Sequence, residues 1–242
     1  MMETIKSKLI RMSKQHIALI TARGGSKGLP RKNVLPVNGT PLIGWTIKAA
    51  LACPLIERVF VSTDDDEIAN ISSEFGAEII VRPDELASDT ASSIDVVSHA
   101  IEWLESNNIA CPRMTLLQPT SPLRTARHLT DALDYFEQQQ ANFVISVFEP
   151  AHTPIKSYIE REGGSIEGLF SREAPYKRRQ DLPRAFQPNG AIYAFSVTEF
   201  KQNNHFPRTN VFPYIMSELD SADVDTMEDL MVVEQRLKEL TQ

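Results

Sequence analysis

Short apolar runs alternate with longer segments of helical periodicity over about the first 150 residues, and this alternation restricts the possible folds more than any other feature. Strands that alternate with helices form a mostly parallel sheet whose two faces the helices cover. We therefore expect an α/β fold of this kind. The expected strands are 16–21, 58–62, 78–81, 114–117 and 142–147, and the expected helices are 41–52, 65–75, 92–104 and 127–136.

The alternation stops after Pro150. Residues 151–190 contain a Gly-Gly pair, several prolines and the run Y-K-R-R-Q-D-L-P-R, which indicates inserted irregular or antiparallel structure. Strand character returns at 190–196, and a closing helix is expected over 226–240, where Thr226 and Asp229 have the spacing of a helix cap. We expect one domain over 1–242, with 151–215 as an inserted segment within it.

Positive charge is concentrated near the start of an acidic chain. The net charge is −7, yet residues 1–56 carry nine lysines and arginines and one acid. This pattern favours a small anionic ligand over nucleic acid or an acidic membrane. Cys53 and Cys111 lack metal-ligand spacing and are expected to remain thiols. With no secretory signal and no apolar run of roughly 20 residues, we expect a cytoplasmic protein without a membrane partner.

The stretch A-R-G-G-S-K-G-L-P-R-K-N, residues 22–33, follows the first expected strand. Glycines allow backbone N–H groups to turn toward an anion, and ligands of such sheets bind beyond the carboxyl ends of the strands. The spacing matches neither the P-loop nor the G-x-G-x-x-G pattern. The alternative is a solvated basic turn. If the loop binds phosphates, the cations that neutralise them are Arg23, Lys27, Arg31 and Lys32.

The stretch S-A-D-V-D-T, residues 221–226, carries two acids two positions apart. In an extended segment Asp223 and Asp225 project from the same face. Mg²⁺ prefers one or two carboxylates together with substrate phosphate oxygens, so this pair is a candidate metal site. The alternative is that the acids cap the last helix. The run 64–66 is a rival metal site, although Asp64 is expected to cap the helix that follows it, with Glu67 completing a capping box.

Other polar residues lie at the ends of expected strands or in the inserted segment. Gln118 ends a strand and is followed by two prolines that stiffen the chain, and Arg82 follows another strand. The polar stretch 84–93 is a candidate for wrapping a base. A second basic zone suits an acidic second substrate, and consists of Lys156, Arg178, Arg179 and Arg184. For each of these the alternative is an ordinary solvated loop.

Five motifs together resemble the acylneuraminate cytidylyltransferases, also called CMP-sialic acid synthetases, with the CMP-legionaminic acid synthetases as close relatives. The resemblance covers about residues 15–240. CMP-Kdo synthetases are less similar, because their first loop typically continues R-L-P-G-K-P-L. The motifs, in order, are A-R-G-G-S-K-G-L-P-R-K-N, V-R-P-D-E-L-A-S-D-T-A-S-S, L-L-Q-P-T-S-P-L-R, P-N-G-A-I-Y and D-V-D-T.

The resemblance implies a Rossmann-like nucleotidyltransferase sheet and a Mg²⁺-dependent transfer of CMP from CTP to the anomeric hydroxyl of a nine-carbon 2-keto sugar acid. It implies that the triphosphate is held by Arg23, Ser26, Lys27 and Lys32, and the cytidine by Asn33, Arg82, Ala91 and Ser93. The sugar acid would face Gln118, Lys156, Arg179 and Tyr193, and Mg²⁺ would face Asp223 and Asp225.

The same resemblance implies a homodimer. In the family, the segment after residue 150 reaches the neighbour's site, and Phe206 is a candidate for such a contribution. Gln187 stands where some bacterial sialic acid enzymes carry arginine, so the sugar is left open between N-acylneuraminate and legionaminic or another nonulosonic acid. We interpret Arg23, Lys32 and Asp225 as the catalytic residues. The alternative from another class is a nucleotide-binding module without turnover.

Overall fold

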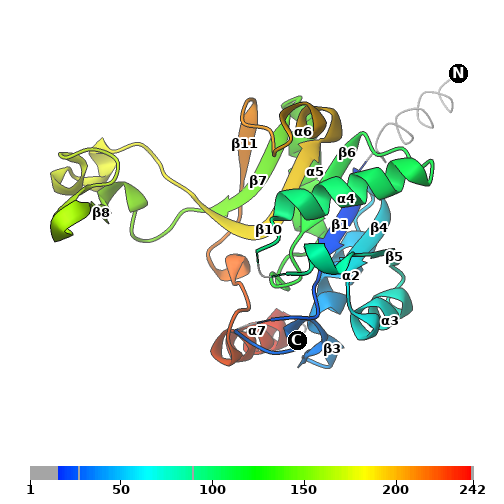
Figure 1. The fold of residues 1–242 in the computed structure, drawn as a ribbon. Helices are drawn as coiled ribbons and strands as arrows, with labels where there is room; N and C mark the ends of the chain where they lie inside the picture. Colours follow the sequence, from blue (N-terminus) through cyan, green and yellow to red (C-terminus); the bar gives the residue numbers. More distant parts are fainter. Residues whose placement is uncertain (1–15, 27, 89, 241–242) are drawn as a thin grey trace, which may run out of the picture.

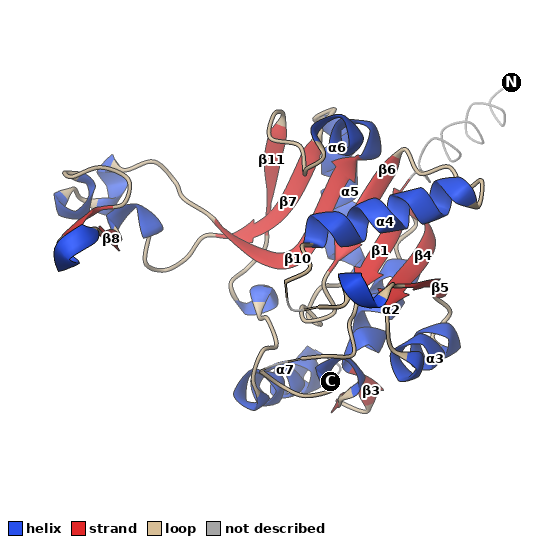
Figure 2. Cartoon of the chain, viewed as in Figure 1, coloured by secondary structure: helices blue, strands red, loops and turns tan. Residues whose placement is uncertain are grey.

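A single large sheet forms the centre of the molecule in the computed structural model, which describes residues 16–26, 28–88 and 90–240 (Figure 1; Figure 2). Within these residues the sheet has seven strands in the order β11-β7-β10-β6-β1-β4-β5. β10 is antiparallel to its neighbours β6 and β7, whereas the other pairs are parallel. The strands are β1 His16–Thr21, β4 Ile56–Thr63, β5 Glu78–Val81, β6 Arg113–Leu117, β7 Phe143–Phe148, β10 Gln187–Ser196 and β11 Val211–Ile215.

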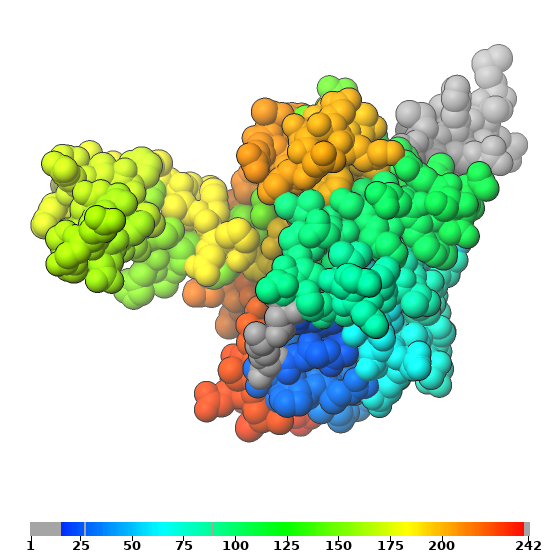
Figure 3. All heavy atoms as spheres, in the orientation of Figure 1, coloured from blue at the N-terminus to red at the C-terminus, as the bar shows by residue number. Residues whose placement is uncertain are grey.

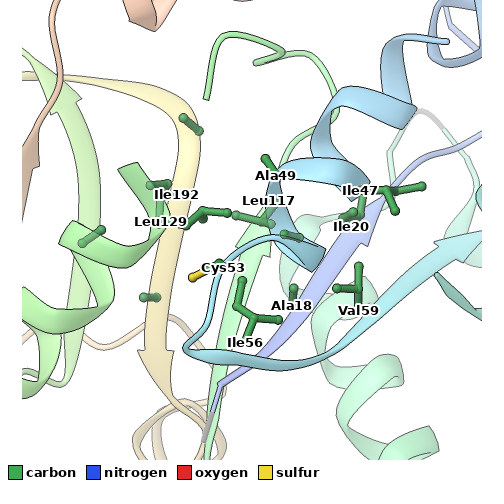
Figure 4. Packing of buried hydrophobic residues seen from close by; sticks show 14 of the residues in the cluster. Ala18, Ile20, Ile47, Ala49, Cys53, Ile56, Val59, Leu117, Leu129 and Ile192 are labelled. Carbon is green, nitrogen blue, oxygen red and sulfur yellow. The ribbon is translucent and has the colours of Figure 1, made fainter. Parts of the chain in front are cut away.

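Helices cover both faces of the sheet. Successive residues of β1 point to opposite sides: Ala18 and Ile20 pack with α2, α3 and α5, whereas Ile17 and Leu19 pack with α4 and α6. Figure 4 shows the first of these layers, in which Ile20 lies beside Ile47 of α2. The helices are α2 Leu42–Leu51, α3 Asp66–Glu74, α4 Ser93–Ser106, α5 Ala126–Gln138, α6 Val197–Asn203 and α7 Met227–Leu240. The predicted α/β fold is confirmed.

Helix caps follow the expected chemistry, with one shift. Asp65, rather than Asp64, caps α3 and accepts a hydrogen bond from the Ile68 N–H at 2.9 Å. The Asp64 carboxylate instead accepts from the Gly24 N–H at 3.1 Å, so the capping prediction was wrong by one residue. At the start of α7 the expected cap is present, because Thr226 Oγ1 accepts from the Asp229 N–H at 3.2 Å.

Two elements of the second half were not expected from the sequence. β11 contains Pro213, which has no N–H to donate, and such a strand is tolerated because β11 lies at the sheet edge. α6 is only seven residues long, too short for a clear helical period. A small antiparallel pair, β2 Pro36–Val37 with β3 Thr40–Pro41, was also missed.

Residues 151–186, called the arm below, extend away from the rest of the molecule (Figure 1). They contain the antiparallel pair β8 Tyr158–Glu160 and β9 Ile166–Gly168, joined to several short 3-10 turns. The irregular and antiparallel structure predicted for this segment is therefore present. Across the described residues, no helix is both long and apolar enough to cross a membrane.

His16 is the first residue of β1, at the amino-terminal end of that strand. Its side chain is buried, with Nδ1 3.1 Å from Thr115 Oγ1 and Nε2 3.5 Å from a Glu137 carboxylate oxygen. Burial lowers the pKa of His16 because it removes water from the charged form, and the nearby Glu137 only partly opposes this effect.

We expect the free energy of unfolding to decrease as the pH falls below the ordinary histidine value of 6.5. The unfolded chain then binds a proton that the folded chain does not bind until lower pH, so acid favours unfolding by at most about 1.4 kcal/mol per pH unit for this group. Urea unfolding of the wild type and His16→Gln between pH 5 and 7 measures the effect. The substitution should flatten the pH dependence, and parallel curves for the two proteins would contradict this account.

Candidate functional site

A pocket of about 480 Å³ opens beyond the carboxyl ends of β1, β5 and β6. Four segments that are distant in the chain line it: the glycine-rich loop, the loop after β5, the loop after β6 and residues 223–225. Figure 3 shows the blue N-terminal segment between the red C-terminal segment and the green segment that leads into α4. The sequence-predicted residues brought together here are Arg23, Ser26, Lys32, Asn33, Arg82, Ala91, Ser93, Gln118, Asp223 and Asp225.

Buried polar contacts hold the glycine-rich loop in place. The Asn33 side chain is buried, and its Nδ2 donates to the Arg23 carbonyl at 3.1 Å. Gly28 lies against the segment that carries the acids, since a Cβ at this position would be 2.7 Å from the Asp225 carbonyl oxygen. The close approach explains why a residue without a side chain is needed there. Lys27 lies outside the described residues, so its predicted role is not addressed by the structure.

Arg31 does not contribute to the pocket. Its backbone is left-handed, with φ of 59°, and its guanidinium pairs with Asp65 and Glu67 on α3. The hydrogen bond from Arg31 is the main cause that lowers the pKa of Asp65. The structure therefore does not support the prediction that Arg31 neutralises phosphates, because its guanidinium pairs with acids at the start of α3.

The acidic run 64–66, the rival candidate for a metal site, has structural roles in this chain. Asp65 both caps α3 and pairs with Arg31, while Asp64 holds the Gly24 N–H. Across the described residues, no group of three or more His, Cys, Asp or Glu side chains is arranged to hold a metal ion. A metal ion in the pocket would therefore depend on the two carboxylates of Asp223 and Asp225 and on oxygens of a bound ligand.

Val224 joins three of the four segments that line the pocket. It is fully buried, its N–H donates to the Thr120 carbonyl at 2.9 Å, and its carbonyl accepts from Lys32 Nζ at 3.1 Å. Lys32 Nζ also lies 2.8 Å from Asp225 Oδ1. Burial of Val224 turns the flanking Asp223 and Asp225 outward into the pocket, as the period of two in an extended segment requires. Thr120 was missed by the sequence analysis, although it lies in L-L-Q-P-T-S-P-L-R.

The two carboxylates differ in their surroundings. Packing of protein around the Asp223 carboxylate displaces water and raises its pKa, and the negative charge of Asp225 adds to this effect, whereas a hydrogen bond with Thr120 and the charge of Lys32 oppose it. Asp225 is exposed, and α7 is capped instead by Thr226 together with Asp229, whose carboxylate accepts from the Thr226 N–H at 2.8 Å. The alternative that the acid pair serves only as a helix cap is thus not supported for Asp225.

Arg82 is a buried cation in the wall of the pocket. Its Nε donates to Ser62 Oγ at 3.2 Å and its Nη2 to the Ser62 carbonyl at 2.6 Å. Burial lowers the pKa of Arg82 to about 10, and the nearby charge of Arg23 acts in the same direction. The group stays charged at neutral pH, and it lines the pocket together with Leu86, Ser88 and Ala91 of the loop after β5.

Gln118 sits against the start of β10. Gly190 has φ of +76°, and a Cβ there would lie 2.3 Å from Gln118 Oε1. A glycine at position 190 is therefore required both by the backbone conformation and by the space that the Gln118 amide occupies.

The remaining predicted site residues do not line this pocket. Lys156 and Arg179 lie on the arm, where Arg179 donates to the Ala151 carbonyl at 2.9 Å and faces the Glu149 carboxylate at 3.6 Å. Tyr193 and Phe206 are half-buried in an aromatic cluster, with ring centroids 6.2 Å apart. Tyr193 is nevertheless close enough for the charge of Asp223 to contribute to its raised pKa, after the larger effect of burial.

Comparison with known proteins gives consistent matches over most of the chain. A family model described as cytidylyltransferase matches residues 17–237. An N-acylneuraminate cytidylyltransferase of Streptococcus agalactiae serotype V is 34% identical over 220 residues, which cover 90% of this chain and 52% of that protein. A pseudaminic acid cytidylyltransferase of Campylobacter jejuni serotype O:23/36 is 30% identical over 217 residues, covering 89% of this chain and 93% of the relative. The chain spans about half the length of the N-acylneuraminate relatives it matches.

A solved structure of a CMP:2-keto-3-deoxy-manno-octonic acid synthetase complexed with CTP superposes with a TM-score of 0.70 and covers 94% of this chain and 100% of its own. Its sequence identity is 20%, so this likeness concerns the fold alone.

We expect Gly28→Ala to lower the free energy of unfolding by about 1–3 kcal/mol, because the new Cβ must push the loop away from the Asp225 carbonyl. Gly25→Ala is the matched control, since a Cβ at Gly25 has nothing within 4 Å. That control should change the free energy by less than about 1 kcal/mol. Urea unfolding measures both, and equal effects of the two substitutions would contradict the close approach.

Proposed function

The chain belongs to the cytidylyltransferase family, and from this premise we propose that it transfers CMP from CTP to the anomeric hydroxyl of a nine-carbon 2-keto sugar acid, with release of pyrophosphate. The observation that carries the proposal is that one pocket places a cationic glycine-rich loop opposite a pair of carboxylates. A polyphosphate needs the first feature for charge neutralisation, and its metal ion needs the second.

In the proposal the triphosphate of CTP lies along the glycine-rich loop. Arg23 and Lys32 supply positive charge, and Ser26 supplies a hydroxyl donor, with Lys27 expected to add a further charge. Lys32 is already held in the pocket by Asp225 and by the Val224 carbonyl, so little ordering is needed when the phosphates bind. The cytidine would lie between Asn33, Arg82, Ala91 and Ser93, which line the same pocket.

Asp223 and Asp225 are the proposed ligands of Mg²⁺. The donor set fits this ion, because two carboxylates face the place where phosphate oxygens would complete the coordination. Burial is the main cause that raises the pKa of Asp223, and the repulsion from Asp225 that adds to it would be relieved by a cation. When bound, Mg²⁺ would supply neutralisation of charge on the phosphates and lower the pKa of a nearby hydroxyl.

The chain's own groups act mainly by position and charge. The anomeric oxygen of the sugar forms a bond to the α-phosphorus as the bond from that phosphorus to the oxygen of the leaving pyrophosphate breaks, and the hydroxyl proton passes to solvent. Arg23 and Lys32 stabilise the negative charge that develops on pyrophosphate. Since the anomeric hydroxyl of a keto acid is comparatively acidic, the proposal requires no side-chain base.

The sugar acid is proposed to occupy the end of the pocket at Gln118, close to Tyr193. Lys156 and Arg179 are the proposed partners of its carboxylate, although in one chain they lie on the arm. A second copy of the chain would bring its arm and the region of Phe206 to this end of the pocket. We therefore propose a homodimer in which each sugar site contains residues from both copies of the chain.

The identity of the sugar and the cellular compartment belong to the same proposal. N-acylneuraminate is proposed first, in view of the name of the Streptococcus relative. Legionaminic acid is the alternative, and the name of the Campylobacter relative adds pseudaminic acid. A cytoplasmic location is supported by Cys53 and Cys111, which are both unpaired thiols.

We expect the purified protein to form CMP-sugar and one equivalent of pyrophosphate from CTP, Mg²⁺ and at least one acid from a panel of N-acetylneuraminic, legionaminic and pseudaminic acids and Kdo. Arg23→Ala should reduce kcat on the order of 10²-fold or more, because a charge that stabilises the transition state is lost. Asp225→Asn should abolish Mg²⁺-dependent turnover.

Asp66→Asn is the control for the acidic substitution, because Asp66 is exposed on α3 outside the pocket and should leave turnover unchanged. Wild-type turnover in Arg23→Ala would remove the glycine-rich loop from the mechanism. A nucleotide-binding module without turnover would bind CTP and release no pyrophosphate with any acid of the panel.

The dimer proposal is supported by apolar side chains exposed on the arm. We expect sedimentation analysis to give a dimer, and Phe170→Asp combined with Tyr176→Ser to give a monomer with reduced sugar-dependent turnover. Met231→Asp, an exposed apolar position on α7, is the control and should remain dimeric. A monomeric wild type, or a dimer that survives the arm substitutions, would contradict the proposal. The exposed apolar residues of the arm are Tyr158, Ile166, Leu169, Phe170 and Tyr176.

A further inference from the structure

Arg124 is buried at the end of the loop that carries Gln118, and the functions proposed above make no use of it. Its relative exposure is 2%, and it directly precedes Thr125, the cap of α5. Its Nη1 donates to the Ala191 carbonyl at 2.9 Å and to the Gln118 carbonyl at 3.2 Å. Among the described residues, Nε and Nη2 have no hydrogen-bond partner. The guanidinium thus bridges the Gln118 loop and β10.

The charge of Arg124 is unfavourable for the fold in three respects. Burial lowers its pKa to about 9, and no carboxylate counteracts this loss of water. The Ala191 carbonyl that accepts from Arg124 belongs to a fully buried member of the apolar cluster that also contains Leu117, Leu129 and Ile192 (Figure 4). The charge also lies at the positive end of the α5 dipole. A buried cation without a paired anion is costly, and the two hydrogen bonds to the Ala191 and Gln118 carbonyls offset only part of that cost.

The position of Arg124 links it to the sugar end of the pocket. It holds the backbone of Gln118, whose amide oxygen occupies the space left free by Gly190. The same junction is reinforced by Ser121 Oγ, which donates to the Asn189 carbonyl at 3.3 Å. Lys156 and Arg179 of the same chain lie away on the arm, so Arg124 places positive charge under this end without help from a second copy.

We propose that Arg124 is a positioning residue for the acidic second substrate: it fixes Gln118 against β10 and provides a buried positive charge that the carboxylate of the arriving acid partly balances. The charge acts at a distance because the surrounding interior screens it much less than water would. The inference rests on the proposed function, since it assumes that an anionic acid binds at the Gln118 end.

The test compares two substitutions that separate charge from hydrogen bonding. Arg124→Lys keeps the charge and a donor, whereas Arg124→Gln keeps an amide donor and removes the charge. In steady-state assays with CTP, Mg²⁺ and the best acid of the panel, Arg124→Gln should raise KM for the acid about tenfold or more and leave KM for CTP within about twofold. Arg124→Lys should stay within about threefold of the wild type for both.

Arg113→Gln is the matched control, because Arg113 lies at the opposite end of β6, where it pairs with Glu137 at 2.7 Å. It should leave both constants unchanged. A wild-type KM for the acid in Arg124→Gln would overturn the inference, as would equal increases in both constants, equal losses in the Lys and Gln variants, or a Gln variant that does not fold. A wild type that makes no CMP-sugar would instead overturn the proposed function itself.

Discussion

The burial of Val224 is the constraint on which the pocket depends. Its side chain packs with Leu29 of the glycine-rich loop, Leu123 of the loop after β6 and the apolar face of α7. Its two backbone hydrogen bonds reach Thr120 and Lys32. One residue therefore aligns three segments that are far apart in the chain, and the alternation of an extended backbone presents an acid on each side of it. The positions of the cationic loop and of the carboxylates relative to each other follow from this single apolar anchor.

The pocket obtains positive charge from residues whose surroundings differ sharply. Lys32 is neutralised by Asp225, whereas Arg82 and Arg124 are buried and donate to backbone carbonyls or a serine rather than to a carboxylate. Arg31, which looked equivalent in the sequence, is fully engaged by the acids of α3. In a chain of net charge −7, the hydrogen bonds of these two buried guanidinium groups go to uncharged acceptors, although the charge of Asp64 partly offsets the effect of burial on Arg82. Such an arrangement favours polyanionic ligands, because binding returns part of the free energy lost on burial of the cations.

The residues proposed to bind the sugar acid lie in two separate parts of the chain. Gln118 and Tyr193 belong to the central sheet, while Lys156 and Arg179 lie beyond its edge on a segment with many exposed apolar side chains. In a single chain these two parts do not meet. A second copy is the simplest way to bring them together, and it would also cover the exposed apolar surface. Specificity for the acid would then depend on both chains, whereas the described residues proposed to bind the nucleotide all line one pocket of a single chain.

The sequence by itself determined the α/β class, the place of the pocket beside the glycine-rich loop and the pairing of Asp223 with Asp225, because these follow from local periodicities of two and 3.6 residues and from glycines in one short loop. The cap shift from Asp64 to Asp65, the strand that contains Pro213 and the diversion of Arg31 to α3 were not predictable in this way. Only the tertiary structure decided these features, the burial of Arg124 and the separation of Lys156 from Gln118. Each depends on which residues far apart in the chain are packed against one another, and a linear pattern does not carry that information.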